Sequence, residues 1–216
     1  MTPVNALIIE LKQSVLTLTL NRPKVNALDL DLIAALQAAF KQAERDEQVR
    51  CVVLTGQGKH FSAGQDVNVF AANEDIPFRY HMLRTYNPLI LQMRNLEKPV
   101  LGAINGMVSG AGLGLALACD LRIASYRARF VVGFTRIGLA PDSAVSLLLP
   151  ALIGLGRATE ATFTNVPISA KQALAWGMVN RVVPAAGLPG KAMDWAVELA
   201  QGPLHAFGLA KRAFNH

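Results

Sequence analysis

The sequence predicts an α/β fold, and two observations support this prediction. Short apolar runs typical of buried strands alternate with longer stretches that have helical periodicity. The 216 residues are 52% hydrophobic and only 17% charged, which is enough apolar material for a sizeable core. Strands that alternate with helices are joined by right-handed crossovers. We therefore expect one domain, with or without an appendage.

The first part of the chain predicts a hairpin, a capped helix and a buried strand. A short polar turn separates two apolar segments, as in a β-hairpin. Asp29 or Asp31 can cap the helix that follows, because a side-chain oxygen satisfies free amides of the first turn. The next apolar run has no polar interruption, which is typical of a strand buried on both faces. In order, these elements are strands at residues 6–11 and 15–20, a helix that ends near residue 44 and a strand at residues 50–56.

The rest of the chain continues the alternation. Residues 67–97 predict a mostly helical region that includes NEDIP (residues 73–77), a loop of a kind that is often mobile. A turn at residues 140–142 precedes another helix, and a Ser169 cap starts a helix that ends at Gly177. The remaining predicted strands are residues 99–106, 120–125, 128–134 and 178–184. The remaining predicted helices are residues 110–118, 191–202 and 203–216.

The uncharged segment from Pro99 to Cys119 has a competing interpretation as a membrane helix. It is long enough to cross a bilayer, and its glycines recur every fourth residue, as in packed membrane helices. Asn105 and Ser109 inside the segment, together with helix-weakening glycines, argue against a span. A buried strand, a glycine turn and a buried helix explain the segment better, so we expect no membrane association.

The net charge of +6 excludes no class of ligand by itself. The basic residues are dispersed, and the densest cluster is Lys211–Arg212, so we expect no nucleic-acid partner. Such a surplus of positive charge suits an anionic small ligand equally well. Cys51 and Cys119 lie in apolar runs, which predicts buried, unpaired thiols. The N-terminus lacks the pattern of a signal peptide, so we expect a cytoplasmic protein.

Two glycine-bearing turns carry the strongest functional signal. HFSAGQD (residues 60–66) and NGMVSGAGLG (residues 105–114) each follow an apolar run and bring small residues to the start of a helix. Backbone N–H groups are exposed in such turns, and two turns aimed at one point can hold a negatively charged oxygen. This arrangement suggests chemistry on a carbonyl compound. The alternative is that both turns serve only tight strand-to-helix packing.

Several other kinds of site are not supported. The glycines at 110, 112 and 114 do not have the GxGxxG spacing of a dinucleotide site, and no acid follows about twenty residues later. The sequence has no GxxxxGK[ST] phosphate loop and no GxSxG nucleophile motif. The four histidines are scattered without metal-ligand spacing, so we expect no metal site.

Five segments in a fixed order resemble the crotonase superfamily, the enoyl-CoA hydratases and isomerases. They are LNRPKVNAL, RCVVLTGQGKHFSAGQDV, KPVLGAINGMVSGAGLGLALACDLRIAS, FTRIGLAPDS and ISAKQALAWGMVNRVVP. The resemblance implies a (ββα)n superhelix with stacked sheets, with residues 1–190 as the core domain. Residues 191–216 would begin a C-terminal helical region that is incomplete here. The family also implies a homotrimer or a dimer of trimers, which the short C-terminus leaves open.

The resemblance further implies roles for residues of the two turns. The backbone N–H groups of Gln65 and Ala111 would form an oxyanion hole for the thioester oxygen of an acyl-CoA substrate. The carbonyl of Ala63 would contact the adenine of CoA, and Asp66 and Gly110 would belong to the same binding site. Lys24 would contact a phosphate; the alternative, a merely solvated lysine, is almost as well supported. CoA would arrive as part of the substrate, with no separate cofactor.

Departures from the family pattern narrow the expected reaction. At the positions of the two hydratase glutamates this chain has Gly114 and Phe134, and neither side chain can transfer a proton. Asp142 remains, in LAPDSA, and here the chain most resembles the enoyl-CoA isomerase branch and the ring-opening isomerase of phenylacetate degradation. In that branch an acid at this position moves the proton. The alternative is that Asp142 only caps a helix beginning at Ser143.

These observations predict an isomerase that shifts the double bond, or rearranges the ring epoxide, of an unsaturated acyl-CoA thioester. Two alternatives stay open: a 2-enoyl-CoA hydratase with an unidentified acid, and a catalytically silent relative that binds acyl-CoA or a protein or RNA partner. The nearest relatives usually have glycines where this chain has Ala144 and Val145, which we expect to narrow or reshape the acyl pocket.

Overall fold

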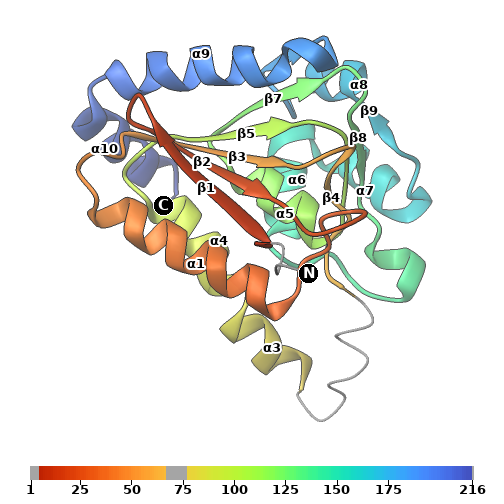
Figure 1. Cartoon of the computed structure of the whole chain (residues 1–216). Coiled ribbons are helices and arrows are strands. Elements are labelled where there is room, and N and C mark those ends of the chain that lie inside the picture. The colour runs from red at the N-terminus through yellow and green to blue at the C-terminus, as the bar shows by residue number, and fades with distance from the viewer. Residues whose placement is uncertain (1–4, 67–76, 216) are drawn as a thin grey trace.

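The computed structural model describes residues 5–66 and 77–215, which form two sheets enclosed by helices (Figure 1). The larger sheet has six strands in the order β1-β2-β3-β5-β7-β10, and all neighbours except the β1–β2 pair are parallel. Its strands are β1 (Leu7–Lys12), β2 (Val15–Leu20), β3 (Cys51–Gly56), β5 (Val100–Ile104), β7 (Leu121–Ser125) and β10 (Arg181–Val183). The predicted α/β class is confirmed.

The smaller sheet has the order β4-β6-β8-β9 and is built from short strands that the sequence analysis mostly missed. Each of β4, β6 and β8 follows a strand of the larger sheet, so the chain repeats a long strand, a short strand and a helical segment. This repeat produces the predicted stacked sheets. The four strands are β4 (His60–Ser62), β6 (Met107–Ser109), β8 (Arg129–Val131) and β9 (Ile168–Ser169).

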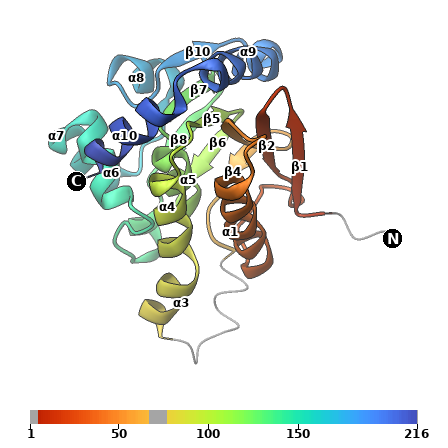
Figure 2. The ribbon, with the colours of Figure 1, turned by 90° about the vertical axis from the view of Figure 1, so that its left-hand side faces the viewer.

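The helices cover both faces of the larger sheet. Helix α9 lies across one face and packs on β2, β3, β5 and β7, whereas α1, α4 and α5 lie together on the other side (Figures 1 and 2). The helices are α1 (Leu30–Arg45), α3 (Phe78–Arg84), α4 (Tyr86–Asn95), α5 (Ala111–Ala118), α6 (Val145–Ile153), α7 (Leu155–Thr164), α8 (Ala170–Ala175), α9 (Leu188–Gln201) and α10 (Leu204–Phe214). Two 3-10 turns, at Phe134–Ile137 and Ala185–Gly187, complete the described elements.

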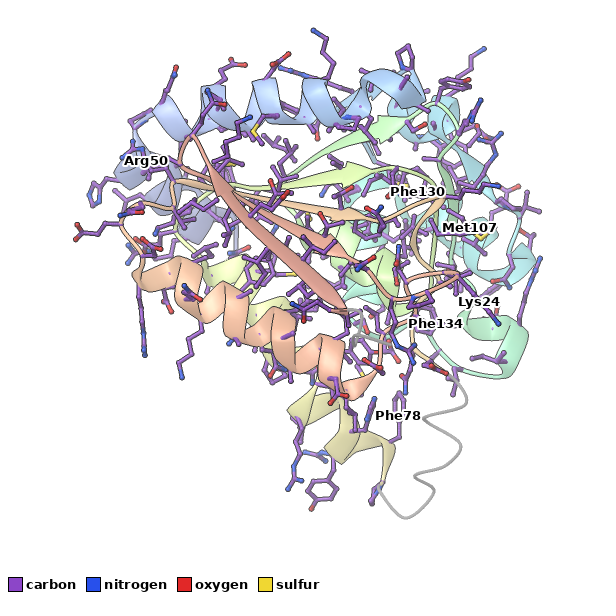
Figure 3. All side chains as sticks on the ribbon, in the orientation of Figure 1. Lys24, Arg50, Phe78, Met107, Phe130 and Phe134 are labelled. Carbon is purple, nitrogen blue, oxygen red and sulfur yellow. The ribbon has the colours of Figure 1, made fainter. Side chains whose placement is uncertain are left out.

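The apolar strands are buried on both faces, which explains their uninterrupted hydrophobic sequences. In β3, Val52 and Leu54 belong to the main core, while Cys51 and Val53 pack with Trp195 of α9 and its neighbours. Arg50, just before β3, donates to the carbonyls of Ala200 and Gly202 and so holds the end of α9 (Figure 3). The domain boundary that we expected at residue 190 falls inside α9.

Local sequence signals account for most element ends. Gln13 and Ser14, with φ of 51° and 62°, form the two-residue turn of the β1–β2 hairpin. Of the two candidate caps for α1, Asp29 is the N-cap and accepts from the Leu32 amide at 2.9 Å. Ser169 and Gln172 form a reciprocal capping box at α8.

Several expectations need correction. Helix α6 begins at Val145 and not at Ser143, and Phe134 lies in a 3-10 turn and not in the strand expected at residues 128–134. Helix α7 was not predicted. The NEDIP loop lies outside the described residues except for Pro77.

The segment from Pro99 to Cys119 contains β5, β6 and the eight-residue helix α5, as the globular interpretation predicted. Within residues 5–66 and 77–215, no helix is both long and apolar enough to cross a membrane. Cys51 and Cys119 are buried and unpaired as predicted, and burial raises the pKa of each thiol to about 12.

Candidate active site

The two glycine-bearing turns meet at one edge of the larger sheet. Because β3 and β5 are parallel, the segments that follow them leave the sheet at the same edge. Gly64 has φ +89°, and a Cβ added there would lie 2.8 Å from the Ser109 carbonyl oxygen and 3.1 Å from the Ala111 nitrogen. A side chain at this position would therefore force the turns apart. The sequence analysis predicted this convergence, and the structure shows it.

Backbone pairing sets the direction of the Gln65 amide. The Leu28 amide donates to the Gly64 carbonyl at 2.8 Å, and the Asp66 amide donates to the Leu28 carbonyl at 2.9 Å. Successive amides of an extended segment point to opposite sides, so the Gln65 N–H points away from Leu28. No acceptor for it is found among the described residues.

The second free amide belongs to Ala111, the first residue of α5. Gly110 precedes it with φ +55°, and no side chain caps the helix. The Ala111 N–H has no acceptor in the described part of the chain, and the positive end of the helix dipole adds to its attraction for an anion. Two unpaired N–H groups in adjoining turns can hold a developing oxyanion.

Helix α5 is buried on every side. The partial negative charge at its C-terminal end is balanced by the side chain of Arg122. Arg122 is 4% exposed, and its guanidinium group donates to the carbonyls of Ala116, Leu117 and Cys119 at the C-terminus of the helix. It also donates to the carbonyl of Met178 at 2.7 Å. A buried cation at the negative end of the dipole stabilises the helix whose positive end lies at the glycine turns.

An ion-pair network holds the first turn against the loop before α1. Arg22 contacts the carboxylates of both Asp29 and Asp66 at 2.7 Å. The carboxylate of Asp66 is thus paired with Arg22. Lys24, in the same loop as Arg22, is exposed. Figure 3 shows Lys24 on the same side of the molecule as Phe134, with Arg50 at the opposite end.

Side-chain hydroxyls tie the two turns together, and the sequence analysis missed them. Ser109 Oγ donates to the Ala63 carbonyl at 2.9 Å, so this carbonyl keeps one lone pair for another donor. Ser62 Oγ donates to the Asn26 carbonyl and accepts from the Gly64 amide. These serines stand in the motifs already quoted, but the carbonyls to which they donate, those of Ala63 and Asn26, are distant along the chain.

The loop that carries Asp142 packs on α5 through Ser143. A Cβ added to Gly114 would overlap the Ser143 carbonyl oxygen and lie 2.8 Å from the Ser143 Cβ. Ser143 is buried, and its hydroxyl donates to Asp142 Oδ1 at 2.7 Å. Burial raises the pKa of Asp142 above its ordinary value, and the hydrogen bond from Ser143 opposes part of that shift.

The Asp142 carboxylate does not cap α6. The N-cap of this helix is Ala144, and no side chain bonds to its first turn. The Val145 amide donates to the backbone carbonyl of Asp142 at 2.8 Å, so the carboxylate is not used for this purpose. Ser143 and Ala144 have φ of 48° and 64°, which is strained for residues with side chains. These two residues separate Asp142 from the first turn of α6, so the alternative role of Asp142 as a helix cap is wrong.

Residue 134, which the family resemblance matches to the second hydratase glutamate, is a phenylalanine and not an acid. Phe134 is buried in the turn after β8, and the Gly133 amide just before it donates to Asn165 Oδ1 at 2.8 Å. The Gly110 amide donates to the Val132 carbonyl at 3.2 Å, which joins this segment to the second glycine turn. A buried aromatic side chain therefore occupies the position that the family resemblance matches to the second hydratase glutamate.

Comparisons with known proteins agree with this geometry. A family model described as enoyl-CoA hydratase/isomerase matches residues 10–216. A 1,2-epoxyphenylacetyl-CoA isomerase of Escherichia coli (strain K12) is 40% identical over 208 residues, covering 94% of this chain and 79% of that protein. The 4-chlorobenzoyl coenzyme A dehalogenase-2 of an Arthrobacter species is 38% identical, covering 94% of this chain and 75% of that protein. The solved structure of an enoyl-CoA hydratase from Bacillus anthracis superposes with a TM-score of 0.92 at 34% identity, covering 98% of this chain and 83% of that one.

Proposed function

Because the chain belongs to the enoyl-CoA hydratase/isomerase family, we propose that it is an isomerase of unsaturated acyl-CoA thioesters. The reaction is migration of a double bond from C3 to C2, or the related rearrangement of a ring epoxide. One observation carries this choice: Asp142 is placed beside α5 by the contact between Ser143 and Gly114, while both hydratase acid positions lack a carboxyl group.

The oxyanion hole consists of the Gln65 and Ala111 N–H groups. They bind the thioester oxygen and become stronger donors to it as the substrate turns into an enolate. Loss of one such donor typically costs about 3 kcal/mol of transition-state stabilisation. Because both donors are backbone groups in glycine-bearing turns, the site keeps its shape while charge develops.

Asp142 moves the proton in this mechanism. The ionised carboxylate removes a proton from C2 of a 3-enoyl thioester, and the resulting dienolate is held in the oxyanion hole. The carboxylic acid then returns the proton at C4, which leaves the double bond between C2 and C3. A carboxylate whose pKa is raised is a stronger base. Its pKa therefore lies closer to that of the C2 proton that it removes from the bound thioester.

The CoA portion is assigned to residues near the same edge. The free lone pair of the Ala63 carbonyl accepts from the adenine amino group, and exposed Lys24 contacts a phosphate. Gly110 lets the ligand approach the backbone, whereas Asp66 supports the turn through Arg22. The homotrimer or dimer of trimers stays a prediction.

A hydratase is less well supported. Water addition needs one group to activate water and a proton for the neighbouring carbon. A glutamate at position 114 would collide with Ser143, and Phe134 cannot replace the second acid. The similar proteins include both an enoyl-CoA hydratase of Bacillus anthracis and a 1,2-epoxyphenylacetyl-CoA isomerase of Escherichia coli, so the family includes both kinds of enzyme.

Product analysis after separate incubations distinguishes the candidates. The substrates are a 3-enoyl-CoA, a 2-enoyl-CoA and an aromatic ring-epoxide CoA thioester. Migration of the double bond or ring rearrangement supports the isomerase, addition of water supports the hydratase, and binding without turnover supports a silent relative. A 3-enoyl-CoA deuterated at C2 adds a mechanistic test: appearance of deuterium at C4 indicates that one group carries the proton between the two carbons.

A further inference from the structure

A cavity of about 800 Å³ lies between the start of α9 and the larger sheet. Its lining includes Val53 and Ala103, which belong to the apolar cluster under α9. Helix α5, which begins with Ala111, packs in the main core on the opposite face of this sheet (Figures 1 and 2). The cavity therefore lies on the other face of the sheet from the helix that carries the candidate oxyanion hole.

The strand register gives this cavity a row of hydroxyl groups. Thr17 and Thr19 of β2 share the face of Val15, which packs under α9. Thr19 pairs with Thr55 of β3, whose hydroxyl donates to the Ala103 carbonyl at 2.8 Å. The hydroxyls of Thr17 and Thr19 have no hydrogen-bond partner in the described part of the chain. Both can therefore donate to a ligand in the cavity.

Basic side chains also line the cavity. Lys59, just before β4, is exposed and forms no hydrogen bond or ion pair with any described residue. Arg127, just before β8, is exposed and lies over the Tyr126 ring at 5.7 Å, and Arg129 is the first residue of β8. Among the described residues that line the cavity, Glu10 is the one acid. Three cations and one carboxylate leave a positive surplus, which attracts an anion.

The loop that carries Lys59 is held in place by the turn after β5. The side-chain amide of Asn105 donates to the carbonyls of Gly58 and His60, each at 3.0 Å. A Cβ added to Gly106 would overlap the Lys59 carbonyl oxygen, so the two turns are in direct contact. Lys59 therefore projects from a fixed backbone, which lowers the entropy cost of binding a ligand.

Apolar side chains form another part of the wall. Met107 of β6 is 42% exposed and pairs with Arg129 of β8, so both side chains lie on one face of the smaller sheet. Pro189 and Met193, from the first two turns of α9, line the cavity as well. No side chain caps α9, and its first turn has no acidic residue. The positive end of the helix dipole therefore adds to the attraction for an anion.

We propose that this cavity binds a small organic anion, a carboxylate or phosphate ester with an apolar body, at a site separate from the thioester site. Lys59 and Arg127 bind the charged group, and the free threonine hydroxyls of β2 donate to its oxygens. Met107 and Met193 contact the apolar body. The site requires no reaction at Asp142, so this inference does not rest on the proposed isomerase activity.

Carbon-13 NMR of labelled methionine methyl groups shows where a ligand binds. Met107 and Met193 line the cavity, whereas Met82 and Met93 lie in the main core and serve as internal references. Each cavity signal is assigned by its loss in Met107→Leu or Met193→Leu. The probes are phenylbutyrate, phenyl phosphate, the neutral phenylbutanol and inorganic phosphate. We expect both organic anions to shift the two cavity signals at millimolar concentration, and the alcohol and inorganic phosphate to bind several-fold more weakly.

Variants of the lining residues test the assigned contacts. Lys59→Gln and Arg127→Gln should each weaken phenylbutyrate binding about two- to fivefold, the usual effect of an exposed charge contact. Thr19→Val keeps the shape of the side chain and should weaken binding by a similar factor, because a hydrogen bond is lost. Lys41→Gln, at an exposed lysine of α1, is the matched control and should bind like the wild type.

The outcomes separate this inference from the proposed function. Unshifted Met107 and Met193 signals with both organic anions overturn it, even if the protein isomerises enoyl-CoA. Equal binding of inorganic phosphate overturns it too, because the apolar wall then contributes nothing. Displacement of phenylbutyrate by CoA places the anion in the thioester site and refutes a separate one, whereas shifts that persist in saturating CoA support it. A protein that binds both organic anions here but turns over no enoyl-CoA overturns only the proposed function.

Discussion

Gly114 of α5 lies directly against the backbone of Ser143, so closely that a Cβ on residue 114 would overlap the Ser143 carbonyl oxygen. The helix that begins with the free Ala111 amide therefore also determines where the Asp142 loop lies. Glycine at position 114, which the family resemblance matches to a hydratase glutamate, leaves room for the loop that carries Asp142.

Replacement of Asp142 by asparagine tests its role as the proton carrier. We expect Asp142→Asn to lower kcat by a factor of about 10² to 10⁴, the usual contribution of a positioned acid or base. The amide keeps the size of the side chain and can still accept from Ser143, so CoA binding measured by calorimetry is retained. Asp194→Asn, at an exposed residue that pairs with Lys191, is the control and should keep full activity. Near-normal turnover in Asp142→Asn contradicts the mechanism.

The raised pKa of Asp142 predicts two pH effects. Activity requires the ionised carboxylate, so kcat falls as the pH drops through a value above the ordinary pKa of aspartate. Stability changes in the opposite direction: the folded state binds this proton more tightly than the unfolded chain, so its contribution to stability falls as the pH rises from the ordinary to the raised pKa. Asp142→Asn should therefore be more stable than the wild type at pH 7. Thermal unfolding from pH 4 to 8 would contradict this if the variant were equally stable or less stable throughout.

The contact between Gly114 and Ser143 predicts that even a methyl group is harmful at position 114. We expect Gly114→Ala to destabilise the protein by about 1–3 kcal/mol, as overpacking usually does, and to reduce activity by shifting Asp142. Gly156→Ala is the matched control, because Gly156 lies in α7 with nothing within 4 Å of an added Cβ. Alanine there should be neutral or stabilising by up to about 1 kcal/mol. Equal unfolding free energies for the two variants in urea would refute the packing argument.

The buried Arg122 predicts a large loss of stability on its removal. Arg122→Met leaves the carbonyls of Ala116, Leu117 and Cys119 without this donor at the buried end of α5. We expect a destabilisation of about 3 kcal/mol or more, since unpaired buried acceptors each cost about 1–3 kcal/mol. Arg127→Met, at an exposed arginine over Tyr126, should change the unfolding free energy by less than about 1 kcal/mol. A small effect in Arg122→Met would show that water or backbone shifts satisfy these carbonyls.

Much of the larger sheet could be predicted from local sequence signals. The hairpin, the Asp29 and Ser169 caps and the uninterrupted apolar strands follow from rules that act over a few residues. The short strands β4, β6 and β9 escaped prediction because two or three residues carry no usable periodicity. They are strands only because a neighbouring segment pairs with them.

The sequence by itself determined the α/β class, the family resemblance and the two glycine-bearing turns, because glycine spacing and apolar patterning are local properties of the chain. It also left Asp142 with two roles, helix cap or proton carrier. Tertiary structure decided against the cap: Ser143 and Ala144 have positive φ, α6 begins at Val145, and the carboxylate accepts from the Ser143 hydroxyl and not from the first turn of the helix. Only the fold could bring Ser143 to Gly114. Contacts between residues so far apart depend on how helices pack, and packing is decided by the whole core rather than by any one segment.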